Sequence, residues 1–124
     1  MLVHAAFAGS LACTIAWAQL PEAKRHYDKG VQLNQRGILV EASVMLTEAL
    51  AIDPEYAEAY YQRGLSFLGM GRNQHAIKDF TAAAGHGIRQ LDPYLRLIKW
   101  HTDRRQYAAG LIVTDQLAAN MPEN

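Results

Sequence analysis

Histidine is the side chain in this sequence best suited to hold a metal ion or to move a proton near neutral pH. The chain has five histidines, and no two of them are three or four positions apart. No single helix face is therefore expected to present two imidazoles, which is the arrangement that binds zinc in helical metal sites. Cys13 is the single cysteine, so neither an internal disulfide nor a zinc site of Cys and His is indicated. These side chains predict no metal site.

Two glycine-rich stretches, Gly69-Met70-Gly71 and Gly85-His86-Gly87, superficially resemble phosphate-binding loops. Both fall where a turn between helices is expected, and glycine serves the backbone geometry of such turns. The sequence contains neither a nucleophile elbow nor a catalytic pairing of Cys with His. We therefore expect a protein that is not an enzyme and that uses no cofactor.

Charge and composition exclude further classes of function. The 124 residues are half apolar, which suits one packed domain, and twelve basic residues balance twelve acidic ones. A neutral chain without long charge runs has no electrostatic reason to bind nucleic acid or an anionic membrane. We therefore expect a partner that is neither nucleic acid nor membrane.

The clearest pattern in the chain is a period of 34 residues. Gly30 and Gly64 are 34 positions apart, and Pro54 and Pro122 are separated by twice that distance. Further pairs with the same spacing are Tyr27 with Tyr61, Leu33 with Phe67, Gly37 with Gly71, Ala42 with Ala76, Leu46 with Phe80, and Ala49 with Ala83. A period of this length is the signature of a helix–turn–helix repeat, an architecture that builds binding surfaces.

Glycine and proline mark the ends of the helices in the first unit, residues 23–56. Its helices are predicted over residues 22–35 and 39–52. Gly37 can adopt the left-handed conformation that ends a helix, and Pro54 disfavours a helical conformation in the residue before it.

The second unit, residues 57–90, repeats this design. The third unit, residues 91–124, begins with Asp92 as the expected N-cap and Pro93 in the first helical turn. Helices are predicted over residues 57–68 and 74–84 in the second unit and over residues 107–120 in the third.

Gly30 and Gly64 fall in the middle of predicted helices, where glycine costs about 1 kcal/mol relative to alanine. Glycine at both corresponding positions predicts that a neighbouring helix approaches closely. Leu46 and Phe80, one in each unit, are expected to fill the space between the helices.

The second unit resembles a tetratricopeptide repeat. Residues 57–67 read Ala-Glu-Ala-Tyr-Tyr-Gln-Arg-Gly-Leu-Ser-Phe, followed by Ala76, Phe80 and Ala83, although Arg63 replaces the usual leucine. The first unit is similar, with His26 at an aromatic position. The third unit departs more, with Ile98, His101 and Thr114 at motif positions, and is interpreted as a degenerate cap. The resemblance implies an all-α, right-handed superhelical solenoid of antiparallel helix pairs over residues 19–124.

The resemblance also implies a concave groove, lined by the leading helix of each unit, that binds a protein or peptide segment. The groove residues that it implies are Tyr27, Val31, Asn34, Tyr61, Leu65, Leu68, Leu95 and Lys99. Some members of the family clamp a terminal carboxylate with Lys and Asn, but Tyr27, Val31 and Gln62 occupy those positions here. An apolar partner segment is therefore expected. An alternative for Tyr27 and Tyr61 is packing between the repeats.

Two other functions remain open. The last predicted helix carries Leu111, Ile112, Val113 and Leu117 on more than one face, so it could join copies of the chain into a homo-oligomer. The chain could also be an accessory or assembly factor for a partner enzyme.

The first twenty residues contain no Asp, Glu, Lys or Arg, and Ala16-Trp17-Ala18 matches a signal-peptidase site. We therefore expect residues 1–18 to be a signal peptide, cleaved before Gln19, and the protein to be exported to the periplasm or secreted. The segment lacks the usual basic start, so a retained membrane anchor and a helix of a cytoplasmic protein remain alternatives. Ser10 stands where a lipoprotein signal would place leucine before Cys13, which disfavours a lipid anchor.

Overall fold

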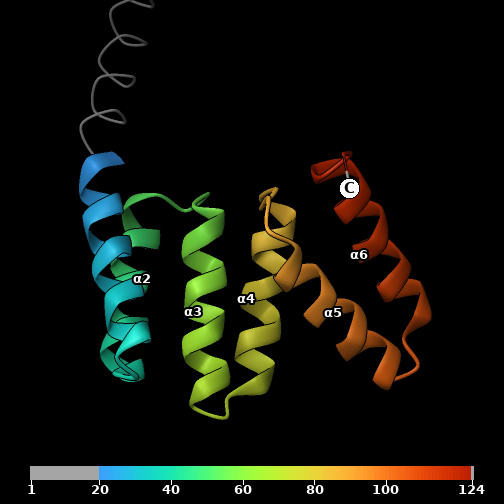
Figure 1. The fold of residues 1–124 in the computed structure, drawn as a ribbon, viewed down its shortest axis with the longest axis horizontal. Helices are drawn as coiled ribbons and strands as arrows, with labels where there is room; N and C mark the ends of the chain where they lie inside the picture. Colours follow the sequence, from blue (N-terminus) through green and yellow to red (C-terminus); the bar gives the residue numbers. More distant parts are fainter. Residues whose placement is uncertain (1–19, 124) are drawn as a thin grey trace, which may run out of the picture.

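The computed structural model describes residues 20–123, and this part of the chain is all helix and turn. It is helical from residue 20 to residue 35, a segment called the first helix below. The helices α2 (Leu39–Ile52), α3 (Ala57–Gly69), α4 (Asn73–Gly85), α5 (Leu91–Asp103) and α6 (Tyr107–Asn120) follow. Neighbouring helices run antiparallel and follow one another along the long axis (Figure 1). The predicted all-α solenoid is confirmed.

The helix pairs form three units. The first helix and α2 form unit 1, α3 and α4 form unit 2, and α5 and α6 form unit 3. The bounds of α2 and α6 are those predicted. The helix α3 is one residue longer than predicted at its end, and α4 is one residue longer at both ends. None of the helices within residues 20–123 is long and apolar enough to cross a membrane. The expected signal peptide, residues 1–18, lies outside the described residues.

The two mid-helix glycines do mark close helix contacts. A Cβ atom on Gly30 would lie 2.6 Å from Cγ of Leu46, and one on Gly64 would lie 2.6 Å from Cε1 of Phe80. Both partner side chains are fully buried, Leu46 at 0% and Phe80 at 1% exposure. Each glycine therefore lets the second helix of its own unit pack directly on the backbone of the first.

A recurring hydrogen bond joins unit 2 and unit 3 each to the turn that precedes it. Tyr60 donates its hydroxyl to the carbonyl of Pro54 at 2.9 Å, and Tyr94 donates to the carbonyl of Ile88 at 2.7 Å. In unit 1 the equivalent position is His26, whose Nδ1 lies 3.2 Å from a carboxylate oxygen of Glu48. The aromatic position of the repeat therefore fixes how units 2 and 3 begin.

The prediction that Asp92 caps α5 was wrong. The helix begins at Leu91, two residues earlier than a cap at Asp92 requires, and its N-cap residue is Gln90, with no side-chain hydrogen bond to the helix end. Asp92 instead accepts hydrogen bonds from Tyr61 and Arg96. A tyrosine of the neighbouring unit and an arginine one turn along α5 therefore engage this carboxylate in place of the helix end.

Four helices end in the same way, with a Schellman motif. The last turn is closed by amide-to-carbonyl bonds from Ile38 to Leu33, Arg72 to Phe67, Ile88 to Ala83, and Gln106 to His101, at 2.8–3.1 Å. The residue before each donor has a positive φ: 76° for Gly37, 76° for Gly71, 79° for Gly87 and 58° for Arg105. Arg105 is therefore the arginine equivalent of Gly37 and Gly71, in a conformation that favours glycine.

Replacing Arg105 with glycine is expected to stabilise the protein. The left-handed conformation costs an L side chain about 1–2 kcal/mol, and the larger entropy of glycine in the unfolded chain offsets part of this. We expect a net gain of about 0.5–1 kcal/mol in the free energy of unfolding, measured by urea denaturation. The matched control is Gly71→Arg, which should lower stability by a similar amount. A loss of stability in Arg105→Gly would contradict the assignment.

Candidate protein-binding surface

The predicted groove residues lie on the first helix, α3 and α5, and five of the eight line two surface hollows. Val31, Asn34 and Leu65 line a hollow of about 320 Å³ between the first helix and α3. Leu68 and Lys99 line a second hollow of about 180 Å³ between α3, α4 and α5. Five of the residues named from the sequence therefore lie at surface hollows, and each hollow has further lining residues.

Asn34 joins unit 1 to unit 2. Its amide nitrogen donates to the main-chain carbonyl of Gln62 at 2.9 Å and to the side-chain oxygen of Gln62 at 3.2 Å. Its amide oxygen accepts a hydrogen bond of 2.6 Å from the hydroxyl of buried Ser66. Because both the nitrogen and the oxygen of the amide already have partners, Asn34 contributes to the shape of the first hollow and not to hydrogen bonding with a partner protein.

Tyr27 packs against the turn between units. Its ring stacks on that of Tyr56, with the centroids 4.9 Å apart and the planes 29° apart. Burial raises the pKa of Tyr27, and the negative charges of Glu58 and Asp28 add to this. The packing alternative therefore describes this residue better than a place in the binding surface.

Tyr61 links unit 2 to unit 3. Its hydroxyl donates to the carboxylate of Asp92 at 2.7 Å, and its ring lies 5.9 Å from that of Phe80. Burial raises the pKa of Tyr61 to about 12, and the hydrogen bond to Asp92 adds to the effect. The tyrosine thus stays protonated and acts as a donor throughout the physiological range.

Asp92 is held in its charged form by two donors. Burial by itself raises the pKa of this carboxyl group, but hydrogen bonds from Arg96 and Tyr61 outweigh burial and lower it. Nε of Arg96 lies 2.6 Å from the carboxylate. The charge of Arg96, at the edge of the second hollow, is therefore already compensated.

The far end of the surface is apolar with paired charges. Leu95 is 51% exposed. Lys99 lies 2.9 Å from the carboxylate of Asp103, and the guanidinium of Arg104 lies 3.2 Å from the ring centre of Trp100. Trp100, with Ile77 and Arg96, also lines the second hollow.

The repeat pattern had not assigned Trp100 to this surface. Its equivalents one and two periods earlier are Ser66 and Gln32, so the period carried no expectation of an aromatic group here. Leu39, which lines the first hollow, was also missed because it belongs to the second helix of its unit. Only the packing of neighbouring units brings these side chains to the surface hollows.

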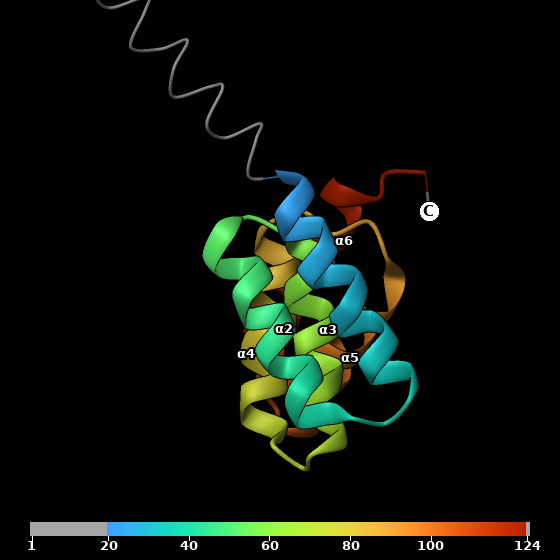
Figure 2. The ribbon, with the colours of Figure 1, turned by 90° about the vertical axis from the view of Figure 1, so that its left-hand side faces the viewer.

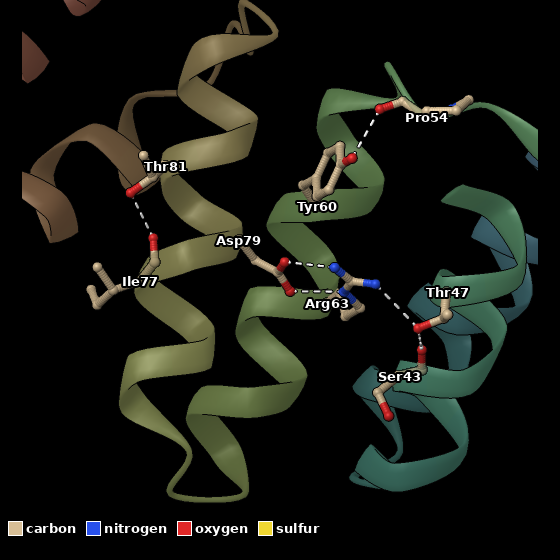
Figure 3. A network of polar contacts seen from close by, with 8 residues as sticks. All are labelled: Ser43, Thr47, Pro54, Tyr60, Arg63, Ile77, Asp79 and Thr81. Carbon is tan, nitrogen blue, oxygen red and sulfur yellow. Dashed lines mark hydrogen bonds and ion pairs between the residues drawn. The ribbon is translucent and has the colours of Figure 1, made fainter. Parts of the chain in front are cut away.

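Arg63, the departure from the usual leucine, belongs to a polar network that holds units 1 and 2 together (Figure 3). Its guanidinium forms two hydrogen bonds of 2.8 Å with the carboxylate of Asp79 on α4, and a third of 3.2 Å with the hydroxyl of Thr47 on α2. The bond with Asp79 is the main reason that the pKa of Arg63 is raised. This network has a structural role.

Potential metal ligands do not cluster in the described part of the chain. Across residues 20–123, no three His, Cys, Asp or Glu side chains lie together as metal ligands would. In the same part of the chain, every buried polar side-chain atom has a hydrogen-bond partner. The buried polar side chains of residues 20–123 are therefore engaged within the fold.

The comparison with protein families agrees with this architecture. A family model described as TPR repeat matches residues 32–71, which cover the end of the first helix, α2 and α3. The chain therefore contains tetratricopeptide repeats, and repeats of this kind generally mediate contacts between proteins. A comparison with the curated proteins finds no match.

Proposed function

We propose that this chain is a protein-interaction adaptor that binds an apolar segment of a partner protein across the first helix, α3 and α5. The observation that carries the proposal is the pair of neighbouring hollows, one beside Leu65 and one beside Leu68 and Trp100. Binding sites for extended or helical segments have this form, an apolar trough with a few polar groups at its edge. The proposal assigns no catalytic step to the chain, in keeping with a family that is generally non-catalytic.

The charges near the hollows favour an apolar partner over an acidic one. Lys99 and Arg96 carry the positive charges at the second hollow, and both are paired with a neighbouring aspartate. A partner carboxylate would have to displace Asp103 or Asp92 to form an ion pair. Exposed Leu95 and the ring of Trp100 offer contacts that require no such exchange.

The proposal is tested first by locating the partner. A photo-crosslinking residue at position 95 in the native host should capture one protein, identified by mass spectrometry, because Leu95 is half exposed beside the second hollow. The double variant Leu68→Ser with Leu95→Ser should then weaken binding to that protein about tenfold or more, since apolar anchors in a hollow carry much of the binding energy.

The control is a matched pair of changes on the second helix of unit 2. Gln74→Ala with Lys78→Glu alters two exposed residues of α4 and should leave the affinity unchanged. Circular dichroism of both double variants checks that each remains folded. Loss of binding in the α4 variant, with normal binding in the Leu68 and Leu95 variant, would place the interaction in the separate hollow that Gln74 and Lys78 line with Trp100 and contradict the proposal.

We also propose that the adaptor acts outside the cytoplasm, in the cell envelope or as a secreted protein. The support is the uncharged apolar sequence that ends in Ala16-Trp17-Ala18. N-terminal sequencing of protein purified from its own host is expected to begin at Gln19. A cytosolic form that begins at Met1 would contradict export and favour the alternative of an uncleaved helix.

A further inference from the structure

Within residues 20–123, α6 is the last helix, and it carries the surface that a following unit would cover. Thr114, Leu117 and Ala118 are the equivalents, one period on, of Phe80, Ala83 and Ala84. In α4 these three side chains are buried in the core cluster that extends to Tyr94 and Leu97 of α5. In α6 the corresponding residues line an open groove of about 460 Å³, together with Leu91, Met121 and Pro122.

More apolar side chains surround this groove. Leu111 and Ile112 are 65% and 61% exposed, and Tyr107 is 61% exposed. Leu111 is the equivalent of Ile77, which lines a hollow with Trp100 of the next unit. The outer surface of α6 therefore retains a sequence suited to contact with another helix, and nothing within residues 20–123 covers it.

The opposite end of the long axis carries a second apolar groove. It lies between the first helix and α2, which face the viewer in Figure 2. Its volume is about 320 Å³, and Lys29, Leu33, Val40, Val44 and Met45 are among its lining residues. Val40 and Val44 are 64% and 48% exposed. Both ends of the array therefore expose apolar surface.

The two terminal helices carry opposite net charge, and α2, which shares the second groove, adds Glu41 and Glu48. Residues 107–123 contain no Lys or Arg and two acidic residues, Asp115 and Glu123, a net charge of −2. Residues 20–36 contain four basic and two acidic side chains, a net charge of +2. Opposite potentials on two surfaces steer them together and select the register in which they meet.

The contact between units 1 and 2 supplies the register. Nη1 of Arg63 on α3 donates to the hydroxyl of Thr47 on α2 at 3.2 Å. The equivalent of Thr47 in unit 3 is Asp115, 68 positions on, and the equivalent of Arg63 in unit 1 is Lys29, 34 positions earlier. Suppose that the first helix of a second copy packs on α6 in the same way that α3 packs on α2. Lys29 of the second copy would then lie opposite Asp115 of the first.

The larger side chain at position 25 can also be accommodated. Arg25 is the equivalent of Ala59, which is fully buried beside Leu50 of α2. The equivalent of Leu50 in α6 is Ala118, which is much smaller. The space left by Ala118 accepts the aliphatic stem of Arg25, while its charged end reaches solvent.

We propose that α6 of one copy binds the first helix of a second copy head to tail, with Asp115 paired to Lys29, so that the repeat array continues across the interface. The two surfaces differ, so the contact is not a two-fold one, and because each copy continues the repeat array of the previous one, copies add in a row. The proposal does not depend on the binding surface described above, which successive copies would lengthen.

The test is the mass of the purified full chain in solution from about 10 μM to 1 mM, the range of weak interfaces. The wild type is expected to grow in mass with concentration beyond a dimer. Asp115→Lys and Lys29→Asp, alone, should each weaken self-association about tenfold, because each places like charges opposite one another. An equimolar mixture of the two variants should restore it, since both junctions then pair Lys with Asp.

Two controls separate this interface from self-association through another surface. Lys78→Asp changes an exposed charge in the middle unit and should leave the mass distribution unchanged. Circular dichroism shows whether the single variants fold. A wild type that stays monomeric over the whole range would overturn the proposal, and so would variants whose mixture associates no better than each alone. A mass that stops at that of a dimer and is unchanged by Lys29→Asp would assign α6 to a two-fold contact with α6 of another copy. This result would also overturn the proposal.

Discussion

Replacing Asp79 with leucine is expected to lower the free energy of unfolding by about 3 kcal/mol. Asp79 is 4% exposed and receives two hydrogen bonds of 2.8 Å from Arg63. The side chain of Arg63 is 21% exposed, so without its partner it keeps a charge that is largely removed from water. The free-energy cost of leaving the charge of Arg63 unpaired, more than the loss of its attraction to Asp79, determines how much stability is lost. Urea denaturation measures it.

The double variant Arg63→Leu with Asp79→Leu isolates the cause. It removes both charges and restores the leucine usual at position 63, so its stability should lie within about 1 kcal/mol of the wild type or above it. Asp28→Ala is the matched surface control, since its pair with Lys24 is exposed and should contribute no more than about 0.5 kcal/mol. Equal losses in Asp79→Leu and in the double variant would mean that packing, and not the unpaired charge, is responsible.

Gly64→Leu is expected to destabilise the protein by about 3 kcal/mol or more, at or above the upper end of overpacking effects. A Cβ atom at this position would already lie 2.6 Å from the ring of Phe80, and the ring is fully buried. The rest of the leucine side chain would therefore force α3 and α4 apart. Thermal unfolding followed by circular dichroism measures the loss.

Gly85→Leu provides the same substitution without the contact. Gly85 ends α4, is exposed, and a Cβ atom there would meet no atom within 4 Å. Leucine also has a higher helix propensity than glycine, so this variant should match or slightly exceed the wild-type stability. A similar melting temperature for the two variants would show that close packing at Gly64 is not what requires glycine.

The helices and their close contacts could be predicted from the sequence because the signals are local or periodic. Gly37, Gly71 and Pro54 end helices through the conformations that their own backbones prefer. The paired glycines Gly30 and Gly64 identified the places where helices meet, because their absent side chains are costly in a helix without such a contact. One capping residue broke the pattern: Arg105 takes the place of glycine and still ends its helix.

The binding surface could be predicted only in part. The leading helices present Leu65, Leu68 and Leu95 where the repeat pattern indicates. The polar contacts between units could not be deduced, because they join residues whose separation follows neither the helical turn nor the period. Asn34 meets Gln62, 28 positions away, and Tyr61 meets Asp92, 31 positions away.

The sequence by itself determined the repeat, its helices and the small residues at their crossings, since steric fit between successive units demands the same residue types every 34 positions. The tertiary structure alone decided which polar groups pair across the units. Asp92 illustrates the difference: it favours a helix cap locally, but Tyr61 and Arg96 provide two donors at 2.7 Å and 2.6 Å. A charged group takes the partners that compensate it best. Arg96 lies one turn along the same helix, and only the packing of α3 on α5 brings Tyr61 into reach.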